Sequence, residues 1–324
     1  MRRKILDKVR DTIERYGLIA KGDLVLVGVS GGPDSVCLLY LLKALSKSLG
    51  FSLEIAHLDH MLRKDSPQDT EFVRSLAVKL AIPATIGRID IKKSAAKGSL
   101  EEIARNKRLE FFIRTAKDVG AKKIALAHNL DDQAETVLMR ILRGTGLYGL
   151  SGILPKRNLY GFEVIRPLIR VQRREIEDFL SRKKVRACLD QTNKNEIFFR
   201  NKIRNKLIPL LEKEYNPSIK NTLSNMAETS ALDYDYLNQL ALRKIKGTRG
   251  KIRLSSFLRF HSALQRLILR LTISHLQGST RRISFAHIKE IEDLILKRPV
   301  NSIVDLPKGI SVAKKVKSII FYRR

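Results

Sequence analysis

A glycine-rich turn near the N-terminus carries the residue types that bind a phosphate group. The turn, Ser30-Gly31-Gly32-Pro33-Asp34-Ser35, follows a valine-rich run at residues 24–29 and precedes leucines at helical spacing in residues 36–49. This order predicts a buried strand, a tight turn and a helix N-terminus. Backbone N–H groups and the helix dipole attract an anion there, and glycine lets the backbone approach it closely. The alternative is a strand-to-helix turn that binds nothing.

This turn differs from two common nucleotide-binding motifs. No Gly-Lys-Ser or Gly-Lys-Thr follows it, and no complete Gly-x-Gly-x-x-Gly is present in it. The Walker-type loop and the dinucleotide-binding fingerprint are therefore excluded at this position.

A second candidate site is the acidic segment at residues 128–136. It follows a predicted strand at residues 121–127 and opens a predicted helix. Asp132 and Glu135 are three residues apart, so they share one face of that helix. Acids in a first helical turn also suit the helix dipole, which is the purely structural interpretation. Their position at the carboxyl end of a predicted strand favours contact with a ligand.

Polar residues also end the predicted strand at residues 51–60. His57 and Asp59 would lie at the same edge of the sheet as the turn. No third and fourth metal ligand stands at a familiar spacing, so a nucleotide-side loop is favoured over a zinc site.

Three basic segments could contact nucleic acid. Arg105 and Arg108 lie on a helix predicted from Ser99, where a solvated helix face is the alternative. A glycine-rich loop follows Arg143, and residues 199–206 are dense in arginine, lysine and asparagine. Such side chains contact phosphates and base edges.

Composition limits the class of protein. The 324 residues carry a net charge of +30, of which residues 1–150 contribute +8 and residues 151–324 contribute +22. This asymmetry favours a polyanionic partner that binds mainly through the second half.

Two cysteines form neither a disulfide framework nor a metal quartet, so we expect a reducing cytoplasm. No apolar run is long enough to span a bilayer and no signal core is present, so we expect no membrane partner.

The order of predicted elements indicates an α/β fold with two domains. Strands alternate with helices up to about residue 170, which predicts a doubly wound, mainly parallel sheet. We predict a catalytic domain at residues 1–215, with a helical subregion from about 145, and a boundary at Pro209–Pro217. Residues 216–324 should form a smaller, mostly helical, basic domain, with short strands near 301–305 and 312–322.

Five ordered motifs resemble one known family. The turn at residues 30–35 is similar to the pyrophosphate loop (PP-loop) of the N-type ATP pyrophosphatases, whose fold is adenine nucleotide α-hydrolase-like. Four further motifs resemble the tRNA(Ile)-lysidine synthetases: His57-Leu58-Asp59-His60 with Leu62-Arg63; Ala104-Arg105 with Arg108; residues 128–136 with 143–147 and 149–150; and residues 190–193 with 200–204. The resemblance covers roughly residues 20–210.

The resemblance implies an ATP-dependent ligase that acts on the isoleucine tRNA with a CAU anticodon. In that family the 2-carbonyl oxygen of the wobble cytidine attacks the α-phosphate of ATP and releases pyrophosphate. The ε-amine of free lysine then displaces AMP from the adenylated tRNA, which leaves lysidine. Family members are commonly dimeric, which implies a homodimer.

The resemblance also assigns roles to residues of this sequence. The expected catalytic residues are Asp132, Glu135, Arg108 and Asp34. Those expected to bind ATP are Ser30, Gly31, Gly32, Pro33, Asp34, Ser35, His57 and Asp59. Asp132 and Glu135 would hold the lysine, and Asp34 would either contact Mg²⁺ or cap its helix. Those expected to bind tRNA are Arg105, Arg143, Arg200, Asn201 and Arg204.

Two other functions remain open from the sequence. A related PP-loop enzyme that thiolates tRNA would need catalytic cysteines or a cysteine-held cluster, and two isolated cysteines fit this poorly. A non-catalytic module that binds nucleotide or RNA could use the same fold, because a fold does not fix a function.

Overall fold

The computed structural model describes residues 4–61, 66–91, 100–185, 187–188, 199–278 and 282–324. They form two compact units, Met1–Ala231 and Leu232–Arg324, whose division falls within the long helix α11 (Ile219–Ile245). The domain boundary at 215/216 therefore stays a prediction, and each unit is described by itself.

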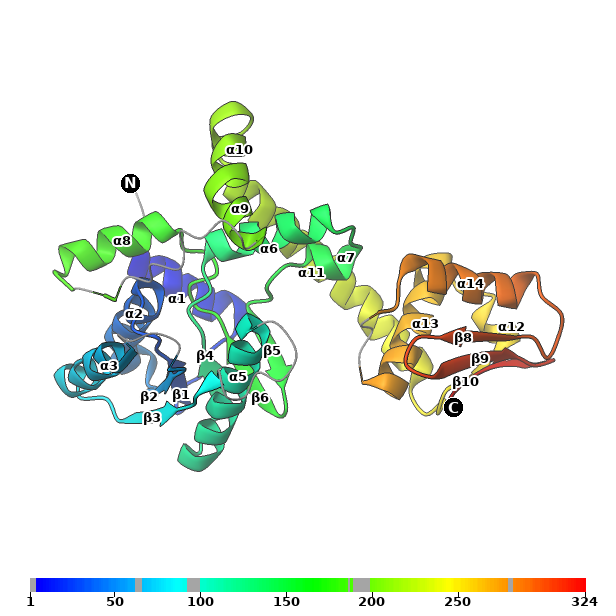
Figure 1. The fold of residues 1–324 in the computed structure, drawn as a ribbon, viewed down its shortest axis with the longest axis horizontal. Helices are drawn as coiled ribbons and strands as arrows, with labels where there is room; N and C mark the ends of the chain where they lie inside the picture. The colour runs from blue at the N-terminus through cyan, green and yellow to red at the C-terminus, as the bar shows by residue number, and fades with distance from the viewer. Residues whose placement is uncertain (1–3, 62–65, 92–99, 186, 189–198, 279–281) are drawn as a thin grey trace. The chain divides into compact units, whose positions relative to one another are not determined.

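The first unit is built on a six-stranded sheet with the order β3-β2-β1-β4-β6-β5 (Figure 1). All neighbours pair in parallel except β5 and β6, which form an antiparallel hairpin. The strands are β1 (Leu24–Gly28), β2 (Ser52–Asp59), β3 (Ala84–Arg88), β4 (Lys123–Ala125), β5 (Lys156–Leu159) and β6 (Phe162–Ile165). The predicted α/β fold with a mainly parallel sheet is confirmed.

Helices cover both faces of this sheet. Val25 and Val27 of β1 belong to one core cluster and Leu26 belongs to another, because successive strand residues point to opposite faces. The first cluster includes α1 (Ile5–Tyr16), α2 (Pro33–Leu49), α3 (Ser66–Leu80) and α8 (Arg173–Arg182). The second includes α5 (Leu100–Val119). A strand buried on both sides explains the nearly continuous apolar run in the sequence.

A further helical layer packs against α6 (Leu130–Leu142). It consists of α9 (Phe199–Lys202), the π-helix η2 (Ile203–Leu207), α10 (Ile208–Glu214) and the start of α11. Ala134, Val137 and Leu138 of α6 contact Ile203 and Ile208 in one apolar cluster. This packing brings the basic residues 200–206 next to the acidic helix.

The sequence missed several local elements of the first unit. The strand expected at 121–127 covers only Lys123–Ala125. Strand β5 was not anticipated, because its Lys-Arg-Asn-Leu sequence shows no apolar alternation and lies at the sheet edge. The loop after Arg143 contains a short helix, α7 (Leu147–Leu150).

The second unit combines helices with a four-stranded antiparallel sheet of order β7-β10-β9-β8. Its elements are β7 (Lys251–Arg253), α12 (Leu254–Phe257), α13 (Ser262–Gln277), α14 (Phe285–Leu296), β8 (Ile303–Leu306), β9 (Ile310–Lys314) and β10 (Ser318–Arg323). The predicted strand at 312–322 is in fact two strands joined by a turn, and β7 was missed. The expected mostly helical domain thus also contains a sheet.

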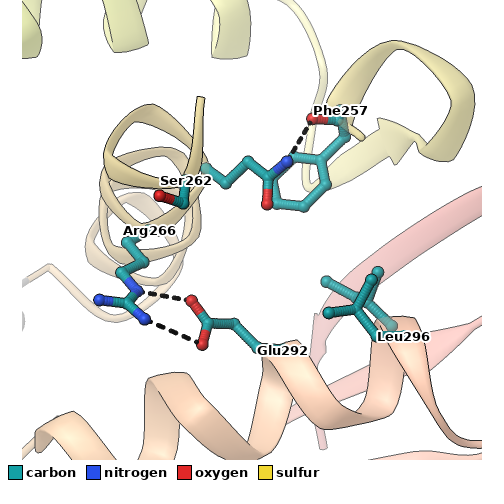
Figure 2. A pocket seen from close by; sticks show the side chains of 7 residues that line it. Phe257, Ser262, Arg266, Glu292 and Leu296 are labelled. Atoms are coloured by element: carbon teal, nitrogen blue, oxygen red, sulfur yellow. Dashed lines mark hydrogen bonds and ion pairs between the residues drawn. The ribbon is translucent and has the colours of Figure 1, made fainter. Parts of the chain in front are cut away.

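An ion pair joins two helices of the second unit. Arg266 of α13 contacts both carboxylate oxygens of Glu292 of α14 at 2.6 and 3.3 Å (Figure 2). A cavity of about 170 Å³ lies beside this pair and is also lined by Phe257, Ser262 and Leu296. Within the described part of the chain, no helix is both long and apolar enough to cross a membrane.

Close packing at the end of β1 gives a first prediction. A Cβ added at Gly28 would lie 2.8 Å from the ring of Phe112. Gly28→Ala should therefore lower the free energy of unfolding by about 1–3 kcal/mol in urea denaturation, because overpacking forces the ring to shift. Gly146→Ala is the matched control, since open space surrounds that position. Equal stability of the two variants would contradict this account.

Candidate active site

The glycine-rich turn lies between the carboxyl end of β1 and the N-terminus of α2. Gly31 has a φ of +87°, a backbone conformation that favours glycine. The hydroxyl of Ser35 accepts the N–H of Ser30 at 3.1 Å and donates to the carbonyl of Gly32 at 2.9 Å, which closes the turn. The N-cap residue, Gly32, makes no side-chain cap, so the first turn of α2 presents backbone N–H groups to an anion.

Asp34 connects this turn to two other helices. Its carboxylate accepts a hydrogen bond from Nδ2 of Asn129 at 3.0 Å and pairs with Arg173 at 3.5 Å. Burial raises the pKa of Asp34 to about 6, Arg173 opposes this shift, and the nearby Asp132 adds to it. Asp34 thus points toward α6 and α8.

Asn129 and Asp132 form a reciprocal cap at the start of α6. Oδ1 of Asn129 accepts the N–H of Asp132 at 3.0 Å, and Oδ2 of Asp132 accepts the N–H of Asn129 at 3.0 Å. Oδ2 of Asp132 therefore has a structural role, as part of the helix cap. The other oxygen, Oδ1, faces basic side chains.

Two arginines hold the acids of α6. Nη2 of Arg200 contacts Oδ1 of Asp132 at 2.8 Å, and Nε of Arg200 contacts Oε2 of Glu135 at 2.7 Å. Arg204 contacts both oxygens of Glu135 at 2.5 and 3.0 Å and Oδ1 of Asp132 at 3.4 Å. Only 1% of Glu135 is exposed, so its charge requires these partners. The hydrogen bond to Glu135 raises the pKa of Arg204, although burial acts in the opposite direction.

His57 and Asp59 support the end of β2. Nδ1 of His57 lies 2.8 Å from the carbonyl of Val29, and its Nε2 lies 3.2 Å from the hydroxyl of Thr70. Burial lowers the pKa of His57, and its two ring nitrogens link the residue before the turn to α3. Oδ1 of Asp59 accepts the N–H of Met61 at 2.8 Å.

The other predicted residues lie around these elements. The guanidinium Nε of Arg108, on α5, donates to Nε2 of His60 at 3.2 Å, and burial together with Arg108 lowers the pKa of His60 to about 4. Arg105 is exposed on the same helix. Arg143 lies over the ring of Phe199, with 5.3 Å between its guanidinium carbon and the ring centre.

Asn129 and Arg173 are parts of the site that the sequence did not indicate. Asn129 could have been found, because Asn-x-x-Asp before an apolar run is a capping signal. His128, in the acidic segment 128–136, also lies at this edge of the sheet. Its Nδ1 is buried without a hydrogen-bond partner among the described residues, and burial and Arg166 lower its pKa to about 3. Arg173 has no local signal, since its contact with Asp34 spans most of the first unit.

The turn, the parallel sheet and the buried acids define a PP-loop protein that uses ATP. The family model for the PP-loop domain matches residues 1–211. The solved U34-tRNA thiolase NcsA from Methanococcus maripaludis shares this fold, with a TM-score of 0.59 and 19% identity over 69% of this chain and 76% of that chain.

Similar proteins of known function show to which family of PP-loop proteins the chain belongs. The chain is 38% identical to the tRNA(Ile)-lysidine synthase of Clostridioides difficile over 98% of this chain and 70% of the relative. It is 37% identical to that of Caldanaerobacter subterraneus subsp. tengcongensis over 99% of this chain and 69% of the relative. The chain belongs to the tRNA(Ile)-lysidine synthase family.

The raised pKa of Asp34 gives a second prediction. A carboxyl whose pKa is higher in the folded than in the unfolded state contributes stability at low pH and loses it as the pH rises through about 6. Between pH 5 and pH 8, the free energy of unfolding of the wild type should therefore fall by about 1 kcal/mol relative to Asp34→Asn. Urea denaturation of both proteins at the two pH values measures this difference. Parallel pH profiles would contradict it.

Proposed function

We propose that this chain ligates free lysine to the 2-position of the wobble cytidine of the isoleucine tRNA with a CAU anticodon. ATP would be consumed to AMP and pyrophosphate through an adenylated tRNA intermediate, as the family resemblance implies. The observation that carries the proposal is the direct link between the anion-binding turn and the acidic helix. Asp34 of α2 bonds to Asn129, which caps the helix that bears Asp132 and Glu135. A phosphate site and a cation site are thus adjacent.

The adenylation step requires a stabilised leaving group. The turn at residues 30–35 and the N-terminus of α2 would hold the departing pyrophosphate through backbone N–H groups. In such a transfer the protein makes few covalent bonds itself, so it acts mainly by positioning the reactants and stabilising the negative charge of the phosphates. Ser30, Gly31, Gly32, Pro33, Asp34 and Ser35, with His57 and Asp59 behind them, remain our proposed ATP-binding residues.

Magnesium fits this site as a metal shared with the nucleotide. Mg²⁺ is commonly held by one or two carboxylates and by substrate phosphates. Among the described residues, no group of three or more His, Cys, Asp or Glu could hold a metal alone. The carboxylate of Asp34 is a suitable ligand, because a nearby cation would favour its charged form over the protonated one that burial favours. When bound, Mg²⁺ would offset the charge of the triphosphate.

The second step requires a deprotonated lysine amine. The ammonium of lysine has a reference pKa of about 10.4, so a carboxylate must bind it and a base must accept its proton. Oδ1 of Asp132 is the oxygen that the cap does not use, and Arg200 and Arg204 lie against it. Glu135 lies one helical turn further on. We assign lysine binding to both acids and proton transfer to Asp132.

The remaining proposed roles concern RNA. Arg108 would face the adenylated base and stabilise negative charge on it. The proposed tRNA contacts are Arg105, Arg143, Arg200, Asn201 and Arg204. We further propose a cytoplasmic enzyme that forms homodimers.

The thiolation alternative is disfavoured by the cysteines. Cys37 is buried in α2, and burial raises the pKa of its thiol far above the usual value, so it is a poor nucleophile. The backbone N–H of Cys188 donates to the carbonyl of Gly31 at 3.0 Å, which gives that segment a structural role beside the turn. Two cysteines also cannot supply a four-cysteine iron–sulfur cluster.

A lysine-incorporation assay tests the proposed chemistry. Wild-type protein, ATP and the CAU isoleucine tRNA should transfer labelled lysine to the RNA. Asp132→Asn should lower the rate about 10²–10⁴-fold and leave tRNA affinity nearly unchanged, because the amide keeps the cap but cannot accept a proton. Asp131→Asn is the matched control, since Asp131 instead contacts Lys220 and the N–H of Arg173.

Two outcomes would contradict the proposal. The first is a wild type that incorporates no lysine. The second is an Asp132→Asn variant that loses turnover and tRNA affinity together, which would favour a binding module.

Salt dependence tests whether the second unit contacts the RNA backbone. A variant that lacks four exposed charges on and beside β7 and β10 should bind tRNA more weakly. Its substitutions are Lys251→Gln, Arg253→Gln, Lys315→Gln and Lys317→Gln. The slope of log K against log salt should also become shallower, by about 0.7–0.9 for each RNA phosphate that the variant no longer neutralises. The control removes Lys43, Lys47, Arg74 and Lys79 from α2 and α3. Equal slopes for both variants would show that the second unit is merely a solvated basic surface.

A further inference from the structure

The carboxylates of Asp132 and Glu135 are already neutralised by protein cations. Two negative charges face two guanidinium groups, from Arg200 and Arg204. The site that the proposed function assigns to the ammonium of lysine therefore has a balanced charge before any substrate arrives. A third cation added to this group would be repelled unless one arginine withdrew.

The two arginines are not equivalent. Arg204 donates hydrogen bonds to both oxygens of Glu135, and 21% of its side chain is exposed. Arg200 contacts one oxygen of each acid and exposes 35% of its side chain. A two-pronged contact with one carboxylate is the stronger arrangement. Arg204 is therefore the fixed partner of Glu135, and Arg200 is the more readily displaced one.

Arg200 adjoins a surface suited to single-stranded RNA. Its neighbour Phe199 is 41% exposed, and Arg143 stacks over the Phe199 ring. Lys202, on the same short helix, is also exposed. Unpaired RNA bases bind to aromatic rings and guanidinium planes, while the phosphates between them bind basic side chains. An anticodon loop bound at Phe199 would place a phosphate within reach of Arg200.

We propose that Arg200 is a positioning residue whose guanidinium takes the place of the lysine ammonium in the RNA-free enzyme. When tRNA binds, Arg200 turns to an RNA phosphate, and the lysine ammonium takes its place beside Oδ1 of Asp132 and Oε2 of Glu135, sharing these oxygens with Nη2 of Arg204. Arg204 stays in place and keeps Glu135 oriented. The exchange preserves the charge balance, and it makes lysine binding follow tRNA binding. This inference rests on the proposed function and specifies the order in which that site is filled.

Equilibrium dialysis with radiolabelled L-lysine tests the exchange on the full chain. In the wild type, saturating CAU tRNA should raise lysine affinity at least about tenfold. Arg200→Gln should show that higher affinity without RNA, because the competing cation is gone. Lys213→Gln, a control at an exposed lysine of α10, should behave as the wild type. Arg204→Gln should bind lysine more weakly with and without RNA, because Glu135 loses its fixed partner.

A purely structural role for Arg200 would not produce a gain in lysine affinity. The inference is overturned if Arg200→Gln binds lysine no more tightly than the wild type in the absence of RNA. Thermal melting checks that this variant folds. If it does not, the wild-type titrations decide, and equal lysine affinity with and without tRNA overturns the inference. A wild type that forms no lysidine refutes the proposed function instead, so the two failures are distinguishable.

Discussion

Burial of the Glu135 carboxylate is the constraint on which the site depends. A charge removed from water must be paired, and losing one partner of such a pair is costly. Here the partners come from residues 199–207, far along the chain from α6. The apolar contacts of Ile203 and Ile208 with α6 bring those partners within reach. Packing and electrostatics thus fix the same helical layer, and neither alone would place the arginines on the acids.

The hydrogen-bonded link through Asn129 extends this constraint to the phosphate site. Asn129 caps α6 with its oxygen and holds Asp34 with its nitrogen. One fully buried amide therefore sets the distance between the turn that would hold pyrophosphate and the acids that would hold lysine. A reaction in two steps, with two substrates that never bind each other directly, requires such a fixed separation.

Much of the fold could be predicted from local pattern. The strand at residues 24–29 and the helix whose leucines lie at 36–49 were predicted because apolar periodicity is a strong signal. Strand β5 and the two strands within 312–322 were missed or merged, since edge strands and tight turns leave weak patterns. Asp132 and Glu135 could be predicted as site residues from their residue types and their position after a strand. Their pairing with Arg200 and Arg204 could not, because it depends on tertiary contacts between residues more than sixty positions apart.

The π-helix η2 carries Arg204 and packs against the apolar core, and its wider turn makes this combination possible. Ile203 and Ile208 are five residues apart and enter the same apolar cluster. An α-helix turns about 100° per residue, so two residues five apart would diverge by more than a quarter turn. The wider π turn brings them into line, and Arg204 lies inside that turn. Loss of a single residue here would restore an ordinary helix and rotate the charged face away from the buried one, so chain length within this turn matters as much as its composition.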